Sequence, residues 1–541
     1  MRTAFLAALL TASAALLLAR TPPAGLLFRG DAPLLLPLRP GALDRLSTAL
    51  THETVAGNPA AFAALHAYLQ ASFPAVFAGL TLHTLRPGGG APPAWLLEWR
   101  GRAGLADAPP GILIGHLDVV PGWSPGPGND DGGPGPFSGH VSPAPDGFIT
   151  SRGALDAKGP ALAMLEAADG LIASGFRPNR TLFVLLGSDE ETGGRGSVAA
   201  AAFVAARLAS AGAPPAVAFL LDEGGVVLPR PASALGRSLI PGPVFLVGVS
   251  EKGWETVRVR VDGRAGHAAQ PYPASPGAVL TGAASALHAR QPAATCGPAC
   301  VAAVSAVARA SGRPLLKLCA AALAGARPGG WLRAGFAVGA ASLAGPTTAA
   351  TLRPTLALTG LRLGGGPGSA ANVVPSSASA VFNARPAPGD APGAAAGRVR
   401  AAVEAAAREL GGKAALADLV ITVSTGGRGG GGGDDADFDT APAPPLTPLA
   451  GPGWAALAAA AATLGTPEAG GVLPIPFIVP GATDSRHWAG LAAGVTLRAC
   501  PLVVPLADVG RVHGKGERVG VGAYLGAVGA YAAFMRVGGG V

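Results

Sequence analysis

The stretch "GILIGHLDVVPG", residues 111–122, decides the fold and points to the chemistry. A short apolar run there stops at His116 and Asp118, two residues apart. The pattern recurs in "RTLFVLLGSDEETGG" (180–194) and in "AVAFLLDEGG" (216–225), where apolar runs end in carboxylates. Short apolar runs bounded by glycine and polar residues are typical of buried strands. Three predicted strands therefore end in residue types that bind metal ions.

Helical segments separate these strands. The segment 156–175, "DAKGPALAMLEAADGLIASG", has Pro160 near its first turn and a glycine at its end, as helices often do. The segment 196–212, "GSVAAAAFVAARLASAG", has the same kind of ending. Alternating strands and helices predict an α/β fold with a mainly parallel sheet that is covered by helices.

The pattern changes near residue 252. The segments 254–271 and 377–386 alternate apolar and polar residues, which is typical of antiparallel strands with one solvated face. The glycine-rich stretch 424–448 has no periodicity and is expected to be disordered. We therefore expect a targeting segment (1–25), the first part of the α/β domain (26–252), an inserted α+β lid or dimerisation domain (253–425), a disordered loop (426–448) and the second part of the α/β domain (449–541).

Composition excludes several classes of protein. The chain has 541 residues, of which 49% are hydrophobic and 13% are charged, so it is globular rather than disordered. Its net charge is +8, but the basic residues are scattered arginines without interleaved aromatic residues. We therefore expect no nucleic-acid partner.

The N-terminus and the cysteines bear on the compartment. "MRTAFLAALLTASAALLLAR" places one arginine before an apolar stretch, which is typical of a secretory signal or a short signal-anchor; an organelle transit peptide is the alternative. We expect entry into the secretory pathway, as a secreted, vacuolar or membrane-anchored protein. Of the four cysteines, Cys296 and Cys300 could form a local disulfide or remain small buried thiols.

The strand ends are expected to meet. In a parallel α/β sheet, ligands gather beyond the carboxyl ends of the strands, here at His116 with Asp118, at the adjacent glutamates of "GSDEETGG", and at Asp222. Asp156 and His513 lie in glycine-bordered loops that can approach the same place. Two histidines with several carboxylates suit Zn²⁺, with Mn²⁺ or Co²⁺ as substitutes. Two ions bridged by a carboxylate would form a two-metal hydrolase site, with two Zn²⁺ per chain.

At this point the motifs carry a family resemblance. "GHLDVVP", "RGALDAKG", "GSDEETGG", "LDEGG", "GRAGHAAQP", "GATDSRHW" and "VHGKGERV" occur in the order and roughly the spacing of the M20 metallopeptidases, over residues 40–536. The chain resembles most the branch of Gly-X carboxypeptidases and N-acyl-amino-acid hydrolases. The resemblance implies a dizinc catalytic α/β domain interrupted by a lid or dimerisation domain. Long Gly/Ala/Pro insertions, including 320–350 and 424–436, depart from the pattern and affect the lid.

The resemblance also assigns roles. His116 and Asp222 would bind one zinc, Glu191 and His513 the other, and Asp156 would bridge them. Two further residues would act beside the metals: Asp118 would orient His116, and Glu190 would be the general base. For substrate binding, the resemblance implies His267 on the scissile carbonyl, within the chain or across a homodimer, Asn372 and Arg385 on polar groups, and Arg486 on a carboxylate.

We therefore expect an enzyme that hydrolyses a peptide or N-acyl amide bond next to a C-terminal amino acid with a free carboxylate. The alternative within the same class is an N-acyl-amino-acid synthase/hydrolase that acts on lipid-like acyl chains. A third hypothesis is a non-catalytic binding protein on a decayed peptidase fold. The complete set of candidate ligands and the retained Glu190 argue against the third.

Overall fold

The computed structural model describes residues 39–123, 133–143, 147–230, 240, 242–343, 345–364, 370–425, 440–464, 472–492 and 494–540. The predicted targeting segment 1–25, and residues 426–439 of the predicted disordered loop, lie outside the described residues. Within the described part of the chain, no helix combines the length and the apolar character that a membrane crossing needs.

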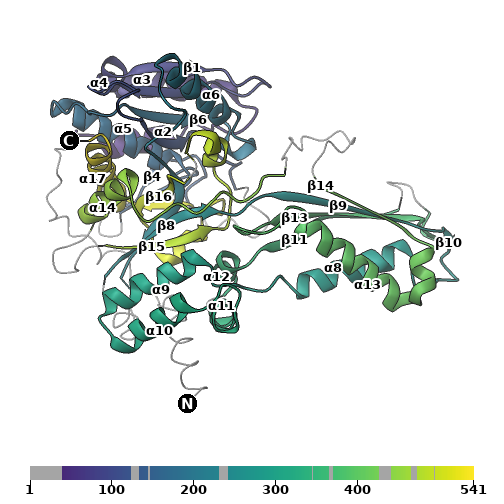
Figure 1. Cartoon of the computed structure of the whole chain (residues 1–541). Helices are drawn as coiled ribbons and strands as arrows, with labels where there is room; N and C mark the ends of the chain where they lie inside the picture. The colour runs from purple at the N-terminus through teal and green to yellow at the C-terminus, as the bar shows by residue number, and fades with distance from the viewer. Residues whose placement is uncertain are drawn as a thin grey trace.

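An eight-stranded, mainly parallel sheet forms the centre of the molecule (Figure 1). Its strands follow the order β1 (Thr81–Leu85), β2 (Ala94–Trp99), β6 (Leu182–Gly187), β3 (Gly111–His116), β7 (Phe219–Leu228), β16 (Thr496–Val503), β8 (Val244–Glu251) and β15 (Leu473–Val479). The strands β6, β3, β7 and β16 pair in parallel, and so do β8 and β15, whereas β1 and β2 are antiparallel. Every residue of β3 and β6 is buried, as their unbroken apolar sequences predict.

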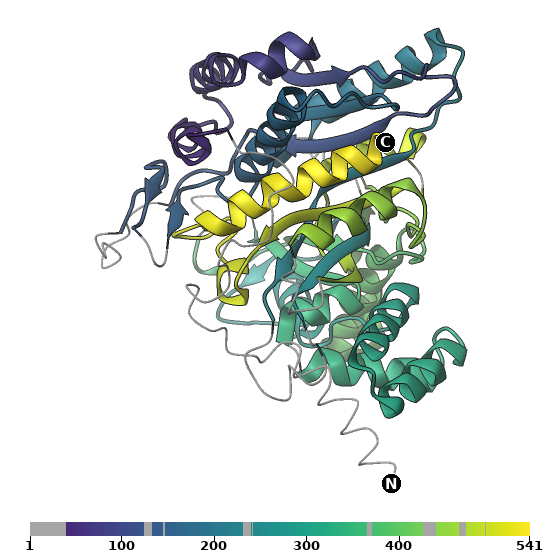
Figure 2. The same cartoon turned by 90° about the vertical axis from the view of Figure 1, so that its left-hand side faces the viewer.

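Helices cover both faces of this sheet, as an α/β fold requires. One face packs against α2 (Ala42–Leu50), α3 (Pro59–Ser72), α4 (Pro74–Gly79), α5 (Lys158–Ala173), α14 (Pro452–Thr463) and α17 (Val521–Gly538). Figure 2 looks onto this face, with α17 in yellow across the strands. The other face packs against α6 (Arg195–Ser210), η4 (Asp484–Trp488) and α15 (Ala489–Ala492). The fold is the predicted α/β class with an inserted domain.

A four-stranded antiparallel sheet extends away from this body (Figure 1). Its order is β11 (Thr355–Leu363), β13 (Ser377–Arg385), β9 (Glu255–Asp262) and β14 (Val420–Thr425). Alternate residues of β9 and β13 are buried beneath α8 (Pro276–Ala289) and α13 (Ala394–Ala417). The alternating sequence thus gives one packed face, as expected for such strands. At its far end, β10 (Gly266–His267) pairs with β12 (Val373–Val374).

The segment between β9 and β11 also supplies a separate group of helices. We call it the helical cap: α9 (Pro298–Ser311), α10 (Pro314–Gly325), α11 (Trp331–Leu343) and α12 (Gly345–Leu352). It packs on the edge of the central sheet, where Ala303, Val307 and Leu316 contact the apolar cluster that contains Ile475 of β15. A disulfide joins Cys296 to Cys300 at the start of α9, which settles that alternative. The inserted segment therefore consists of two parts with separate apolar cores.

Two short structures complete the site side of the sheet. The strands β17 (Arg518–Gly520), β5 (Phe148–Thr150) and β4 (His140–Val141) form a small antiparallel sheet. Two short helices, η2 (Glu190–Thr192) and α16 (Leu506–Val509), come after β6 and β16 in the chain, beyond the carboxyl ends of these strands. The loops next to them carry residues with predicted catalytic or metal-binding roles.

Candidate metal centre

Asp156 lies between two groups of potential metal ligands. Its Oδ1 is 3.0 Å from Nε2 of His116, and its Oδ2 is 2.9 Å from Nε2 of His513. The first group is completed by Glu223, whose Oε2 is 3.5 Å from His116 Nε2. The second is completed by Glu191, whose Oε1 is 3.2 Å from His513 Nε2. One carboxylate thus faces two sets of ligand atoms with its two oxygens.

The sheet topology explains this convergence. His116 is the last residue of β3, Glu223 lies in β7 beside it, and Glu191 lies in η2 directly after β6. Parallel neighbours end at the same edge of a sheet, so their terminal side chains come together. His513 arrives from a loop near the C-terminus with φ of +60°, a strained value for a residue with a side chain. Such outliers occur at sites whose geometry the surrounding structure holds in place.

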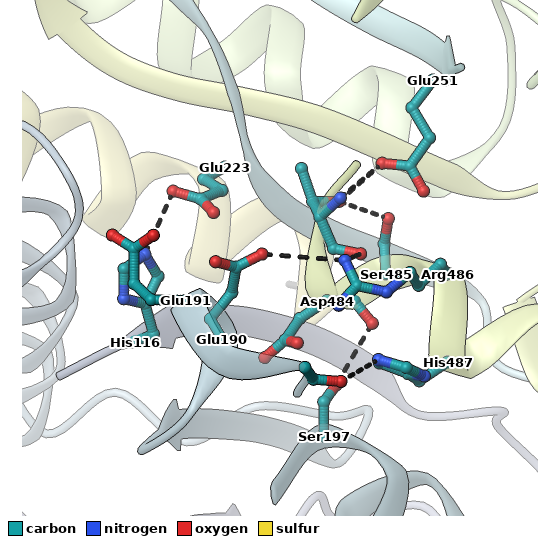
Figure 3. A network of polar contacts seen from close by, with 12 residues as sticks. His116, Glu190, Glu191, Ser197, Glu223, Glu251, Asp484, Ser485, Arg486 and His487 are labelled. Atoms are coloured by element: carbon teal, nitrogen blue, oxygen red, sulfur yellow. Dashed lines mark hydrogen bonds and ion pairs between the residues drawn. The ribbon is translucent and has the colours of Figure 1, made fainter. Parts of the chain in front are cut away.

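The predicted ligand Asp222 belongs to neither group in the structure. Its carboxylate accepts hydrogen bonds from the backbone N–H groups of Ser485 (2.6 Å) and Glu223 (2.9 Å). Adjacent residues in a strand point to opposite faces, so only one of the two acids can face His116. The structure places Glu223 there (Figure 3), and Asp222 instead ties β7 to η4.

Asp118 stands behind His116. Nδ1 of His116 is 2.9 Å from the backbone oxygen of Asp118 and 3.3 Å from its Oδ1. Oδ2 of Asp118 accepts a 2.9 Å hydrogen bond from the backbone N–H of Glu191. Asp118 therefore contacts a histidine of the first group and the backbone of a glutamate of the second. A backbone oxygen or a carboxylate in this position fixes the ring orientation of a metal-binding histidine.

Glu517 was not singled out from the sequence, yet it supports Asp156. Its Oε1 accepts hydrogen bonds from the backbone N–H groups of Leu155 (2.9 Å) and Asp156 (3.1 Å). Its Oε2 pairs with Arg152 at 2.7 Å, and both side chains are buried. Arg152 Nη2 also donates to the backbone oxygen of His513 at 3.2 Å. Both residues stand in motifs already quoted, "RGALDAKG" and "VHGKGERV", but their pairing links segments far apart in sequence.

Many ionisable side chains are crowded at this site, and the crowding shifts their pKa values. Burial, followed by the negative charge of Asp156, raises the pKa of Glu223 to about 8. Burial and then Glu223 also raise the pKa of Glu190 well above its ordinary value. Hydrogen bonds to Asp156 and Glu191 raise the pKa of His513 to about 10. The carboxylates repel one another and recruit protons onto the histidines, so the group lacks positive charge.

The residues fit divalent cations. The donors of both groups are imidazole nitrogens and carboxylate oxygens without a thiol, which suits Zn²⁺ and, among alternatives, Mn²⁺ or Co²⁺. Oε1 of Glu191 is buried and accepts no hydrogen bond, although it lies 3.2 Å from His513 Nε2. A buried carboxylate oxygen without a donor is costly unless it has another partner. A cation at each group would supply that partner.

Glu190 is placed differently from its neighbour Glu191. Its carboxylate lies between His116 on one side and Arg486 on the other, as Figure 3 shows. Oε1 of Glu190 is 3.8 Å from Nη1 of Arg486, and Glu190 belongs to neither ligand group. The two glutamates are successive residues of η2, about 120° apart around a 3₁₀ turn, and they therefore point to different places.

Two arginines adjoin this side. Arg385 stacks over the ring of Trp254 at 3.8 Å, and its Nη1 is buried without a hydrogen-bond acceptor. Burial, and then the charge of Arg486, lower the pKa of Arg385 to about 10. Two like charges that repel each other, one with a buried unpaired donor, favour an anion between them.

Two predicted substrate contacts are not brought to the metal ligands within this chain. His267 is exposed in β10, and Asn372 precedes its partner strand β12. Both stand at the far end of the four-stranded sheet in Figure 1. A role for His267 across a homodimer stays a prediction.

An apolar cavity of about 650 Å³ opens at the metal ligands. Asp156 and Glu223 line its inner end, and they are the charged side chains among its described lining residues. The remaining walls come from the sheet edge (Val226, Leu246, Ile475, Phe477, Leu502) and from the helical cap (Ala303, Val307, Leu316, Cys319, Phe336, Leu352). This volume lies within the usual range of small-molecule sites, roughly 300–1,000 Å³.

Comparison with known proteins agrees with this geometry. The sequence profile of Peptidase family M20/M25/M40 matches residues 112–537, and the chain belongs to this family. "Probable carboxypeptidase S-like 2" of Dictyostelium discoideum is 30% identical over 263 residues, 46% of this chain and 45% of the relative. "N-fatty-acyl-amino acid synthase/hydrolase PM20D1" of Homo sapiens is 34% identical over 186 residues, 33% of this chain and 32% of the relative. The chain thus spans less than half of each relative's length.

Solved structures share the fold. The M20 family metallo-carboxypeptidase Sso-CP2 from Sulfolobus solfataricus matches with a TM-score of 0.60 at 15% identity, over 93% of this chain and 100% of that one. Human carnosine dipeptidase 1 matches with a TM-score of 0.57 at 15% identity, over 92% of this chain and 96% of that one. At this identity the likeness concerns the fold alone.

Proposed function

We propose that the chain is a two-metal hydrolase that cleaves the amide bond between an apolar acyl group and an amino acid with a free carboxylate. The observation that carries the proposal is Asp156, whose two oxygens face two histidine–carboxylate groups at the inner end of an apolar cavity. The first group would be His116, Asp156 and Glu223, and the second Asp156, Glu191 and His513.

The donors favour Zn²⁺, two ions per chain. When bound, such ions activate a water molecule and polarise the amide carbonyl. The residues of the chain supply the remaining steps. Glu190 lies beside the ligands without belonging to them, so it is free to accept a proton from water and to deliver it to the leaving nitrogen. Asp118 orients the His116 imidazole for the whole cycle.

The substrate's two ends would lie on different surfaces. Arg385 and Arg486 would bind the amino acid's carboxylate, because a guanidinium matches a carboxylate with two parallel hydrogen bonds. The acyl group would occupy the apolar cavity, which offers no charged partner beyond the metal ligands among its described walls. This cavity favours an N-acyl amino acid with a long acyl chain over a polar peptide. The name of the human relative mentions N-fatty-acyl amino acids, in line with this choice.

We also propose entry into the secretory pathway. The Cys296–Cys300 disulfide supports it, because disulfides persist mainly in oxidising compartments. The N-terminal apolar stretch of the sequence is consistent with the same route.

A chain-length series tests the substrate. Purified protein with added Zn²⁺ is given N-acetyl-, N-octanoyl- and N-palmitoyl-phenylalanine and the dipeptide Gly-Phe, and released phenylalanine is measured by mass spectrometry. We expect kcat/KM to rise with acyl length, because each buried methylene contributes about 0.8 kcal/mol. Hydrolysis of none of the four would overturn the proposal, whereas hydrolysis of Gly-Phe alone would leave a peptidase and remove the acyl cavity's role.

A matched pair of variants tests the cavity itself. Ala303 lines the cavity from α9, and Ala310 lies on the exposed side of the same helix. Ala303→Trp should displace at least two methylenes and lower kcat/KM for the palmitoyl substrate about tenfold. The acetyl substrate should be nearly unaffected, and Ala310→Trp should leave both unchanged. Equal losses on both substrates with Ala303→Trp would contradict the assignment.

A further inference from the structure

The helix α10 carries apolar residues beyond the side that lines the cavity. Leu316 and Cys319 line the cavity. On the adjoining, exposed side, which we call the outer side, Leu315 and Leu318 are 54% and 63% exposed. A helix that merely covered a pocket would carry polar residues on its outer side, as amphipathic helices do. The outer leucines stand one turn apart and therefore form one apolar strip.

Trp331, at the start of α11, is a further exposed apolar residue of the helical cap. It is 84% exposed, the highest value for a large apolar side chain in the described part of the chain. It lies close to the end of α10, because Arg333, two residues later, donates to the backbone oxygens of Leu323 (2.9 Å) and Ala324 (3.1 Å). Tryptophan is enriched where one side of a protein meets the boundary between lipid and water.

The stretch of chain that forms this surface carries charges of one sign. No aspartate or glutamate occurs in the sequence between Asp262 and Asp390, a stretch that contains the whole helical cap. Within the cap, Arg309, Lys317 and Arg327 are exposed. An apolar strip bordered by cations, without a nearby acid in the same stretch of chain, complements a surface that offers anions around an apolar interior.

We propose that the outer side of the helical cap, through Leu315, Leu318 and Trp331, docks on an anionic lipid surface. The leucines and the tryptophan enter the boundary between headgroups and acyl chains, and the cations contact the headgroups. Each such cation strengthens binding to an anionic membrane, an attraction that salt weakens. The same helix then contacts lipid with one side and the cavity with the adjoining side, so a lipid-like substrate would pass beside the cap to reach the cavity. Docking itself does not depend on the proposed catalytic activity.

Vesicle binding tests this proposal with the full chain. The protein is sedimented with vesicles of phosphatidylcholine alone and of phosphatidylcholine with about 30% phosphatidylserine, at low and at physiological salt. We expect binding to the mixed vesicles that is at least tenfold tighter than to the neutral ones and that weakens with salt. Equal binding to both vesicles, or no binding to either at low salt, overturns the proposal.

Matched variants locate the surface. The double variant Leu318→Ser, Trp331→Ser and the charge reversal Lys317→Glu, Arg327→Glu should each lower vesicle affinity about tenfold or more. The controls are Val420→Ser, because Val420 is 64% exposed in β14, and Lys413→Glu, because Lys413 is exposed on α13. Both controls should bind as the unaltered chain does. If the controls lose binding as the cap variants do, or if the cap variants change only self-association in sedimentation velocity, the cap is not the lipid-binding surface.

Discussion

The most informative substitution separates Glu223 from its neighbour Asp222. Glu223→Gln removes the charge of one of three ligands in the first group, whereas Asp222→Asn removes a charge that faces backbone donors. A cation held between Glu223 Oε2 and His116 Nε2, which lie 3.5 Å apart, would be no farther than this from the carboxylate, and a unit charge pair at 3.5 Å is worth about 5 kcal/mol at an effective dielectric constant near 20. That is an upper bound, because glutamine keeps an oxygen ligand. We expect one of two metal ions to bind about 10²–10³-fold more weakly in Glu223→Gln.

The matched variant Asp222→Asn should be mild. Ser485 and Glu223 donate to different oxygens of Asp222, so the one amide oxygen of asparagine keeps one of these two hydrogen bonds. Neither oxygen belongs to a ligand group, so we expect metal affinity within about tenfold of the unaltered chain. The assay is isothermal titration of metal-free protein with Zn²⁺, with circular dichroism to check the fold. If Asp222→Asn loses the metal ion and Glu223→Gln keeps it, our placement of the ligand is wrong.

Three further predictions test other parts of the site and the fold. Glu190→Gln should keep both metal ions and lower kcat about 10²–10⁴-fold, whereas Glu191→Gln should lose metal first; equal, mild effects in zinc content and turnover would contradict these roles. Burial lowers the pKa of His66 to about 4, so the unfolded chain binds a proton below about pH 6.5 that the folded chain refuses. Stability is therefore lost as pH falls from 6.5 towards 4, by roughly 2 kcal/mol at pH 5, and His66→Phe should remove this loss in urea unfolding at pH 7 and 5. Arg498→Met should lower the free energy of unfolding by about 3–5 kcal/mol, because it leaves Glu251 buried without its 2.9 Å partner. Adding Glu251→Leu should restore most of this loss in thermal unfolding. Equal stability of the unaltered chain, the single variant and the double variant would refute the pairing.

The sequence predicts the central sheet because its signal is local. The strand β3 is an apolar run in which every residue is buried, and β6 is the same. The rule that parallel strands end at one edge then brings His116 and the η2 glutamates together without further information. The candidate ligands that the structure gathers are for this reason largely those that the sequence suggested.

The choice between Asp222 and Glu223 could not be made in the same way. The two acids are adjacent in β7, and strand periodicity allows either one to face the site. The deciding contact is the hydrogen bond that the backbone N–H of Ser485 donates to Asp222, because Ser485 lies in a segment far away in the sequence. The pairing of Glu517 with Arg152 is likewise a contact between distant segments.

The sequence does not predict the helical cap as a separate part. Its alanine-rich helices lie between β9 and β11 along the chain, so sequence order alone assigns them to the same inserted domain as the four-stranded sheet. Their apolar sides instead pack on β15 and close the cavity. His267 shows a limit of the motif comparison. Its motif matches the family, but the motif does not predict that His267 lies at the far end of the four-stranded sheet, a position that follows from the pairing of β10 with β12.

The most direct test of the two-metal hydrolase is a titration of activity with metal. Chelator-treated protein is given increasing Zn²⁺, bound metal is counted by elemental analysis, and release of phenylalanine from N-palmitoyl-phenylalanine is followed by mass spectrometry. We expect activity to appear with bound metal and to reach its plateau at two ions per chain, as the two ligand groups around Asp156 require. A plateau at one tightly bound ion would contradict the dinuclear centre, and no release at any metal content would contradict the hydrolase itself.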